Sequence, residues 1–259
     1  MKKILIALAV LVVIAWAPWM VFPAASLQYL IEDSLHNERM QVESIGFEKG
    51  FFYTLRAEKA VVRSSGRELL VFDSVRSRIN PLGLLRRQLR LTVHGEIGGG
   101  SFSGNLCLEK QTGQIALDVK KAAINKIPLL QRTGMQGTGT VSVRVNVMNE
   151  SGTIVFATDD ARFEPSLVAG MKLPLNFFHR ATGSLSVKGN ILKVESVSLE
   201  GKDIFARLKG EIHNALMDMT MELMPGRAFV ENPLFLSEFE RYKVSPGYYV
   251  IPVRGAISL

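Results

Sequence analysis

The chain has 259 residues and a formal net charge of +7; 47% of the residues are hydrophobic and 21% are charged. This composition excludes a disordered tail, a collagen and a membrane protein with many spans, and it supplies apolar material for a sizeable core. The single cysteine, Cys107, excludes an internal disulfide framework and a zinc site built from cysteines.

A long apolar run at the N-terminus predicts a membrane anchor over residues 1–25. Lys2 and Lys3 precede a charge-free run of 19 residues, 4–22, which as a helix would be roughly 28 Å long. That length is close to the ~30 Å hydrocarbon core of a bilayer. The side chains expected to form the anchor are Ile4, Leu5, Leu8, Leu11, Ile14, Trp16, Trp19 and Phe22.

The flanks of this run predict its orientation. Trp16, Trp19 and Phe22 cluster at its far end, and such aromatic rings favour the membrane–water interface. Basic residues stay on the cytoplasmic side, so we expect a single-pass protein of the bacterial inner membrane with its bulk in the periplasm. A cleaved signal has a shorter apolar region of about 7–15 residues. Run length therefore favours a retained anchor, although the small residues at 24–26 leave cleavage open.

Residues 26–40 predict an amphipathic helix after the anchor. Its apolar face carries Leu27, Leu30, Ile31 and Leu35. Two interpretations remain open at this point. The helix either lies on the membrane surface or closes one end of a β-structure, or it is a linker helix that packs on its own domain.

From about residue 42 the helical period gives way to alternation of apolar and polar side chains. The alternating runs cover residues 57–63, 69–79, 89–97, 141–147 and 185–188. Turn signals rich in glycine separate these runs. The pattern predicts a mainly β fold, a curved antiparallel sheet with one apolar and one polar face, as one continuous domain over residues 41–259.

The alternation also predicts which side chains share the apolar face, because every second residue of a strand points the same way. The side chains expected there are Val141, Val143, Val145, Val147, Leu185 and Val187. Two forms of this face remain open. A closed face would be the dry core of a sandwich or barrel, whereas an open face would be a groove for a lipid tail or a partner's apolar segment.

Short apolar segments interrupt the strands at residues 82–87, 127–131 and 165–170. Each is expected to form a short crossover or one-turn cap, because it is too short for an independent helix. A longer helix is expected over about residues 227–241. A loose repeat of glycine-led strand, turn and strand recurs at residues 104–124, 139–163 and 183–212.

Residues that could carry chemistry are sparse. His94 and Glu96 lie on the polar face of one strand with no nucleophile near them in sequence, so a solvated strand face is favoured over acid–base work. The glycines at 98–100 are expected to form a hairpin turn rather than a phosphate-binding loop. Cys107 is expected to be a small strand residue. We therefore predict no catalytic, metal or cofactor site, and we do not expect an enzyme.

The strongest basic cluster lies in the N-terminal half of the chain. It consists of Arg76, Arg78, Arg86, Arg87 and Arg90. Clustered basic residues near a bilayer each contribute about 1 kcal/mol of attraction to anionic headgroups, so a headgroup or acidic-partner contact is one interpretation. An ordinary solvated face is the other. Nucleic-acid binding is not expected of a domain outside the cytoplasm.

Several segments resemble the type II secretion system protein N family. They are residues 80–85 (NPLGLL), 93–104 (VHGEIGGGSFSG), 126–130 (KIPLL), 137–141 (GTGTV) and 247–257 (GYYVIPVRGAI). Residues 190–201 (NILKVESVSLEG) also resemble the repeats of the wider group of AsmA-like periplasmic proteins. The resemblance covers nearly the whole chain, and each matching motif is a strand-and-glycine pattern.

The first resemblance implies an accessory component of the machine that exports folded proteins across the outer membrane. Its partners would be other inner-membrane components of that machine. The AsmA-like resemblance implies a curved sheet with a groove, and a role in lipid binding or transfer for envelope maintenance, with phospholipid as the ligand. Neither resemblance implies catalytic residues.

Overall fold

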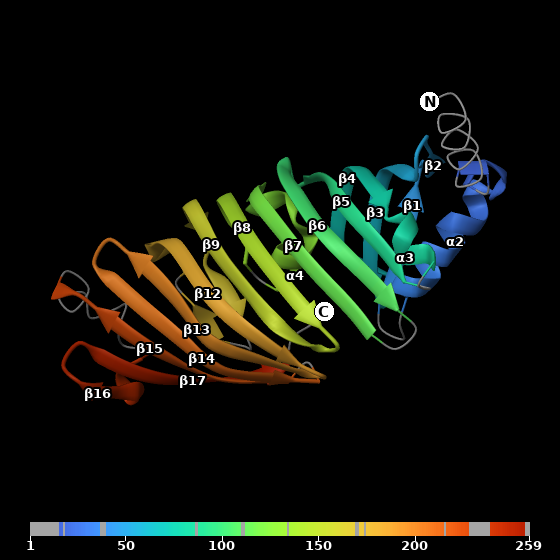
Figure 1. Ribbon diagram of the computed structural model, residues 1–259. Coiled ribbons are helices and arrows are strands. Elements are labelled where there is room, and N and C mark those ends of the chain that lie inside the picture. Colours follow the sequence, from blue (N-terminus) through green and yellow to red (C-terminus); the bar gives the residue numbers. More distant parts are fainter. Residues whose placement is uncertain are drawn as a thin grey trace, which may run out of the picture.

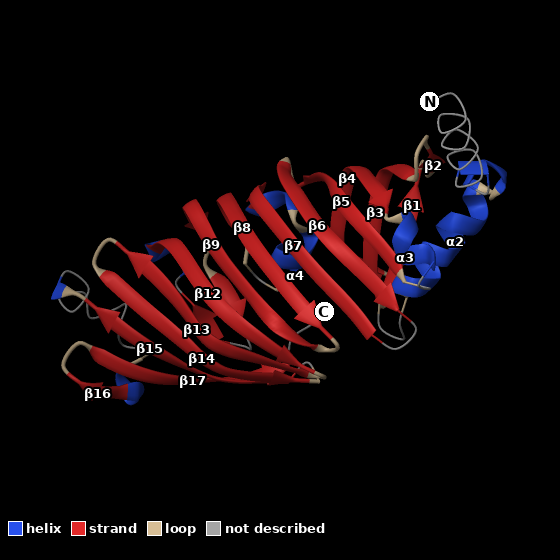
Figure 2. Cartoon of the chain, in the orientation of Figure 1, coloured by secondary structure: helices blue, strands red, loops and turns tan. Residues whose placement is uncertain are grey.

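The computed structural model describes residues 16–17, 19–36, 40–85, 88–109, 112–133, 135–168, 171–173, 175–214, 216–227 and 239–256. Over these residues the prediction of a mainly β chain is confirmed. One large antiparallel sheet dominates the molecule, and helices are few and short (Figures 1 and 2).

The large sheet is a meander in which most strands pair with their neighbours in sequence. Its N-terminal strands are β1 (Gln41–Ile45), β2 (Glu48–Lys49), β3 (Thr54–Ser64), β4 (Arg67–Ile79), β5 (Leu89–Ile97), β6 (Gly100–Glu109) and β7 (Thr112–Ala123). Its remaining strands are β8 (Gly137–Met148), β9 (Ser151–Phe163), β12 (Phe178–Lys188), β13 (Ile191–Gly201), β14 (Ile204–His213), β15 (Leu216–Pro225), β16 (Lys243–Ser245) and β17 (Tyr248–Ala256). The order places β1 at one edge and β16 at the other.

Short elements connect the long strands. They are α3 (Pro81–Leu85), η1 (Ile124–Lys126), α4 (Pro128–Arg132), η2 (Leu175–Phe177) and η3 (Glu240–Tyr242). The predicted crossovers near residues 82–87 and 127–131 correspond to α3 and α4. The expectation of a cap at residues 165–170 is wrong, because β10 (Ser166–Val168) pairs with β11 (Met171–Leu173) as a small separate hairpin. The apolar residues of this segment predicted a helical turn, but their backbone pairs with β11 as a strand.

β-bulges bend the sheet. In β4 two residues, Ser74 and Val75, lie opposite the single Gly95 of β5, and Ser74 has a φ of 51°. A second register shift follows Val119 in β7, where Lys121 has a φ of 53°. Further shifts lie between β12 and β13 and between β13 and β14. Because bulges increase the right-handed twist, strands near β5 run steeply in Figure 1 while those near β17 run almost horizontally.

The predicted hairpin turn at the three glycines is confirmed. Gly98 and Gly99 have φ values of 57° and 79° and form the turn between β5 and β6, while Gly100 is already in β6. A left-handed conformation at two consecutive positions suits glycine, which carries no Cβ. The turn is thus explained by hairpin geometry.

The apolar side chains form two core clusters on one face of the sheet. The first spans β3 to β9 and includes Leu55, Ile79 and Val141. The second spans β9 to β17 and includes Met219 and Ile251. Two further side chains, Phe156 and Phe163, pack against both clusters, so the sheet carries one apolar layer with two centres.

The predicted membrane anchor lies mostly outside the described residues, which exclude Ile4, Leu5, Leu8, Leu11 and Ile14. In the part of the chain that the structure describes, no helix has both the length and the apolar character needed to cross a membrane. The predicted helix over residues 227–241 also falls mainly outside the described residues; Phe239, which is described, is buried in the second cluster.

Candidate functional site

The six side chains predicted to share an apolar face do lie on one face of the sheet. Val145 of β8 is in register with Ile154 of β9, which is in register with Leu185 of β12. Val147 is in register with Gly152, which pairs with Val187, and Val143 pairs with Phe156. Val141 continues the same alternation at the start of β8. Period-two alternation in the sequence therefore located this face correctly.

The face continues on both sides of these strands as two neighbouring rows, which we call the central apolar rows. Adjacent members are register partners across β6, β7, β8, β9, β12, β13 and β14, except that Gly152 of β9 lies between Val147 and Val187. The rows consist of Leu106, Ile115, Leu117, Val145, Val147, Ile154, Leu185, Val187, Leu192 and Ile212. These ten side chains are half-buried, while Val194 of β13, the register partner of Leu185, is only 4% exposed. Apart from Val194, this part of the face is neither a sealed core nor a bare surface.

Burial changes along each strand. Val141 is only 5% exposed, whereas Val145 and Val147 of the same strand are half-buried. Near Val141 the face is covered by Ile124 and Ile127, from η1 and the residue after it, which belong to the same buried cluster. Leu129 and Leu130 of α4 also pack against this cluster, and α4 lies behind the sheet in Figure 1. Short crossovers thus seal one end of the central strands.

The two core clusters meet where the aromatic ring of Phe156 packs over a glycine of the neighbouring strand. Phe156 of β9 is the register partner of Gly183 in β12. A Cβ at Gly183 would lie 2.4 Å from the Phe156 ring, so only glycine leaves room for the ring there. Phe102 and Gly95 repeat the arrangement, and the Phe102 ring centroid lies 4.9 Å from that of Phe72. These glycines let large rings lie flat over the sheet.

The predicted arginine cluster divides between the polar face and undescribed residues. Arg76 and Arg78 of β4 and Arg90 of β5 are exposed, and they alternate with the apolar-face residues of their strands. Arg86 and Arg87 lie outside the described residues. The structure therefore places three of the five arginines on the face opposite the central apolar rows.

Sequence reasoning missed one member of this basic surface. Arg56 of β3 is exposed and directly opposite Arg76, which is itself opposite His94 of β5. Among the described residues, no carboxylate lies within ion-pair distance of Arg56, Arg76 or Arg78. Like charges directly opposite in a sheet are destabilising, so this arrangement costs stability. Arg56 lies opposite Arg76 because of the register between β3 and β4, and the pattern of a single strand does not reveal that register.

The polar face of the C-terminal half is different, because several of its charges are paired. Arg254 Nε lies 2.9 Å from Asp218 Oδ1, and Lys193 Nζ lies 3.2 Å from Glu195 Oε2. Hydrogen bonds from Ser186 and Lys193 lower the pKa of Glu195, and the bond from Ser186 has the larger effect. Several charges on this half are thus neutralised locally, whereas Arg56, Arg76 and Arg78 on the N-terminal half have no ion-pair partner among the described residues.

Residues considered for catalysis do not converge. His94 lies opposite Arg76 and Ser103, Glu96 lies opposite Asp73, and Cys107 lies opposite Arg90. Within the described ranges, no group of three or more His, Cys, Asp or Glu side chains is placed to hold a metal ion. The arrangement offers apolar area and positive charge on opposite faces, which suits binding.

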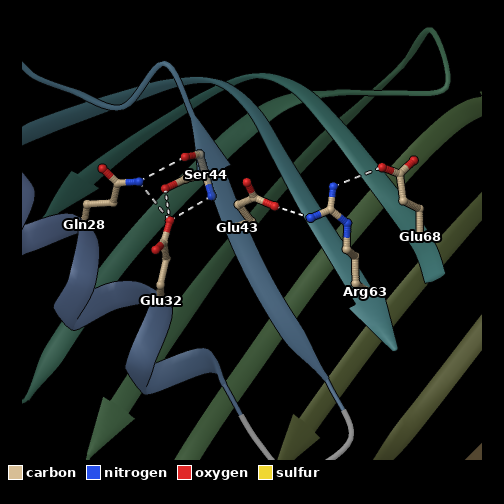
Figure 3. Close-up of polar contacts among 6 residues, drawn as sticks. All are labelled: Gln28, Glu32, Glu43, Ser44, Arg63 and Glu68. Atoms are coloured by element: carbon tan, nitrogen blue, oxygen red, sulfur yellow. Dashed lines mark hydrogen bonds and ion pairs between the residues drawn. The ribbon is translucent and has the colours of Figure 1, made fainter. Parts of the chain in front are cut away.

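Helix α2 (Ala24–Leu35) packs on the N-terminal edge of the sheet, which fits both a helix that closes one end of the β-structure and a linker helix that packs on its own domain. Leu27 is buried in the first cluster. Three hydrogen bonds converge on Glu32 Oε1: from Ser44 N at 2.8 Å, from Ser44 Oγ at 2.5 Å and from Gln28 Nε2 at 3.0 Å (Figure 3). Burial raises the pKa of Glu32, but these hydrogen bonds outweigh it and leave the pKa below its ordinary value. The helix is thus fixed to β1.

Beside this contact, Arg63 of β3 bridges two carboxylates. Its guanidinium pairs with Glu43 of β1 and lies 3.3 Å from Glu68 of β4 (Figure 3). The three side chains join neighbouring strands across the sheet edge to which α2 is attached. Because the group is partly exposed, its contribution to stability is small.

The aromatic residues that end the predicted anchor are attached to the same edge. The Trp16 ring stacks on Phe51 and Phe52, with centroid distances of 6.2 Å and 5.9 Å. Trp19 is buried, and its Nε1 donates a hydrogen bond of 2.9 Å to the carbonyl of Gly50. Lys49 Nζ donates to the carbonyl oxygens of Trp19, Met20 and Phe22. Trp16 and the residues from Trp19 to Phe22 are therefore held against the β-domain by specific contacts, and Trp19, predicted to be a side chain of the membrane anchor, is instead buried in the first core cluster.

Comparisons with known proteins found no match of any kind. No family model matches the chain, no curated protein is similar to it, and no solved structure matches its fold.

Proposed function

We propose that this chain is an accessory component of the type II protein secretion system, anchored in the inner membrane, whose periplasmic β-domain acts as a binding scaffold. The resemblance of residues 80–85, 93–104 and 247–257 to the protein N family supports the system. The apolar run at 4–22 supports the anchor. The half-buried state of the central apolar rows supports a binding role, and it is the observation that carries the proposal.

The dimensions of the rows suit an extended apolar segment of a partner. Seven neighbouring strands from β6 to β14 carry them. At a strand spacing of about 4.8 Å, the ends of a row lie roughly 29 Å apart. An extended chain covers that distance with about nine residues. Contiguous apolar area of this extent on a monomer marks an interaction site more often than idle surface.

A second candidate is AsmA-like lipid binding, with phospholipid as ligand and envelope maintenance as role. The observation that favours it is that the apolar face is covered at one end of the central strands and less covered at the other. Crossovers seal the end at Val141, while Val147 and Val187 at the other end stay half-buried, as a trough with one closed end would require. Both candidates use the same face and differ in its occupant.

Deletion of the gene separates the two candidates when exoprotein secretion and outer-membrane permeability are both measured. Loss of secretion with an intact permeability barrier supports the secretion role, and the reverse result supports lipid handling. Complementation with Val187→Glu should fail, because a charge on the central apolar rows opposes an apolar occupant. Complementation with Val155→Glu should succeed, because Val155 is 49% exposed on the opposite face.

A further inference from the structure

A surface outside the central apolar rows exposes large apolar side chains at the N-terminal edge of the sheet. Phe51 is 68% exposed and Phe52 is 61% exposed, and both belong to the turn between β2 and β3. Met20, Val21 and Phe22 are exposed beside them, since Lys49 ties the carbonyls of Met20 and Phe22 to the start of this turn. We call these five residues the aromatic tip.

The tip is a rigid feature held by its own hydrogen bonds. Gly50 N donates to the carbonyl of Thr54 at 2.9 Å, and Thr54 N donates back to the carbonyl of Phe51 at 3.2 Å. Phe52 and Tyr53 have φ values of 49° and 60°, a conformation that side chains other than glycine rarely adopt. The same pair of left-handed residues occurs at Asn149 and Glu150 in the turn between β8 and β9, so it is the geometry of a tight hairpin turn. Here it projects two phenylalanine rings outward.

The position of the tip relative to the apolar run identifies its occupant. The run at residues 4–15 leads directly into Trp16, whose ring stacks on Phe51 and Phe52. Any bilayer that holds the run is therefore within a few residues of the tip. Exposed phenylalanine and tryptophan rings partition into the headgroup region of a bilayer.

Charge near the tip agrees with a lipid surface. Lys49, Arg56 and Glu48 line the same hollow as Phe51 and Thr54. Arg56 continues into the unpaired row with Arg76 and Arg78 on the polar face. The surface is thus positive on balance, with one carboxylate at its rim, and clustered basic residues attract anionic headgroups.

We infer that the aromatic tip is a second membrane contact, in which Phe51 and Phe52 of the β-domain insert into the interface of an anionic phospholipid bilayer and fix the tilt of the sheet relative to that bilayer. This inference rests on the anchor in the proposed function. It adds a peripheral contact made by the β-domain itself. With two contacts, the sheet would be held in one orientation at the membrane.

The test uses the full chain in vesicles of phosphatidylethanolamine and phosphatidylglycerol, with Cys107 replaced by serine. A single cysteine is placed by Phe52→Cys and labelled with an environment-sensitive fluorophore. Val244→Cys serves as the control, because Val244 is 66% exposed in β16 at the opposite edge of the sheet. If the replacement at Phe52 prevents folding, Phe51→Cys takes its place, because Phe51 is 68% exposed and lies outside the apolar run.

We expect the label at residue 52 to shift its emission to the blue and to lose most of its fluorescence with nitroxide-labelled lipids, while the label at residue 244 responds to aqueous iodide. Equal iodide quenching at both positions would overturn the inference, as would protection of residue 52 from both quenchers. Carbonate extraction of the same vesicles distinguishes failure of the tip inference from failure of the proposed anchor. A chain that stays in the membrane with an iodide-accessible tip refutes the inference alone, and a chain that leaves the membrane refutes the anchor as well.

Discussion

Val141 and Val147 have the same side chain, lie on the same strand and point to the same face of the sheet, yet one is buried and the other is half-buried. The difference comes from what lies above them. Near Val141, η1 covers the face and α4 packs on the same core cluster, whereas the described crossovers leave Val147 less covered. Alternation therefore decides which face is apolar, and the connections between hairpins decide how much of that face is sealed.

Glutamate substitution at the two valines should give the largest difference. We expect Val141→Glu to lower the free energy of unfolding by about 3–5 kcal/mol, because it leaves a charge in a sealed core without a partner. Val147→Glu should cost about 1 kcal/mol, because its carboxylate can reach water. Urea unfolding of the detergent-solubilised chain, followed by circular dichroism, measures both. Equal losses at the two positions would mean that the face is covered evenly along the strand.

An added methyl group at Gly183 tests the junction of the two core clusters. Gly183→Ala should destabilise the domain by about 1–3 kcal/mol, because the new Cβ would meet the Phe156 ring at 2.4 Å. Gly113→Ala is the matched control. Gly113 also lies in a strand, and a Cβ there would have no neighbour within 4 Å, so we expect a change within about 0.5 kcal/mol. A Gly183→Ala variant as stable as its control would show that Phe156 has room to move.

Much of this fold could be predicted from the sequence, and the limits have physical causes. The runs at 89–97 and 141–147 alternate strictly, so the strands and their shared face follow from period two. The bulge at Ser74 and the crossing of Phe156 over Gly183 depend on pairing between strands, which no single run encodes. The hairpin of β10 and β11 was mistaken for a cap, because a run of a few apolar residues suits either structure.

The candidate site shows the same limit. Val143 and Leu185 were assigned to one face from alternation alone, and their register partners confirm that assignment. Their half-burial could not be predicted, because it depends on how far η1 and α4 extend over the face. Likewise, Arg56 joins Arg76 only through the register of β3 with β4. Local pattern gives the orientation of a side chain, while tertiary contacts decide its exposure.

Helix α2 is attached to β1 through the carboxylate of Glu32, so its contribution to stability should depend on pH. The lowered pKa of Glu32 means that the bonds from Ser44 and Gln28 stabilise α2 fully above the unfolded-state pKa of about 4.3. This contribution is lost as pH falls through the lower pKa of the folded state. Glu32→Gln should remove about 1 kcal/mol or less at pH 7, since the group is partly exposed.

The measurement is the difference in unfolding free energy between the wild-type chain and Glu32→Gln at pH 7 and again below pH 4. The difference should shrink at the lower pH, because protonation removes the same charge that the substitution removes. A difference that stays constant across this range would show that the carboxylate charge of Glu32 does not hold α2.

The smallest effects are expected on the polar face, where the two halves of the sheet should respond in opposite directions. Arg76→Thr removes a like-charge pair with Arg56 and should raise stability by a few tenths of a kcal/mol. Arg254→Thr removes an exposed ion pair with Asp218 and should lower stability by about 0–0.5 kcal/mol. Thermal unfolding of both variants tests this, and a loss at Arg76 would indicate an anionic partner for it.

Photo-crosslinking in living cells shows whether the central apolar rows hold an apolar occupant. A photoreactive residue is placed at Val187 on these rows and, as the control, at Val155 on the opposite face of the neighbouring strand. We expect a specific adduct, either with a secretion component or with phospholipid, from position 187 and none from position 155. No adduct at 187, or the same adducts from both positions, would contradict this expectation.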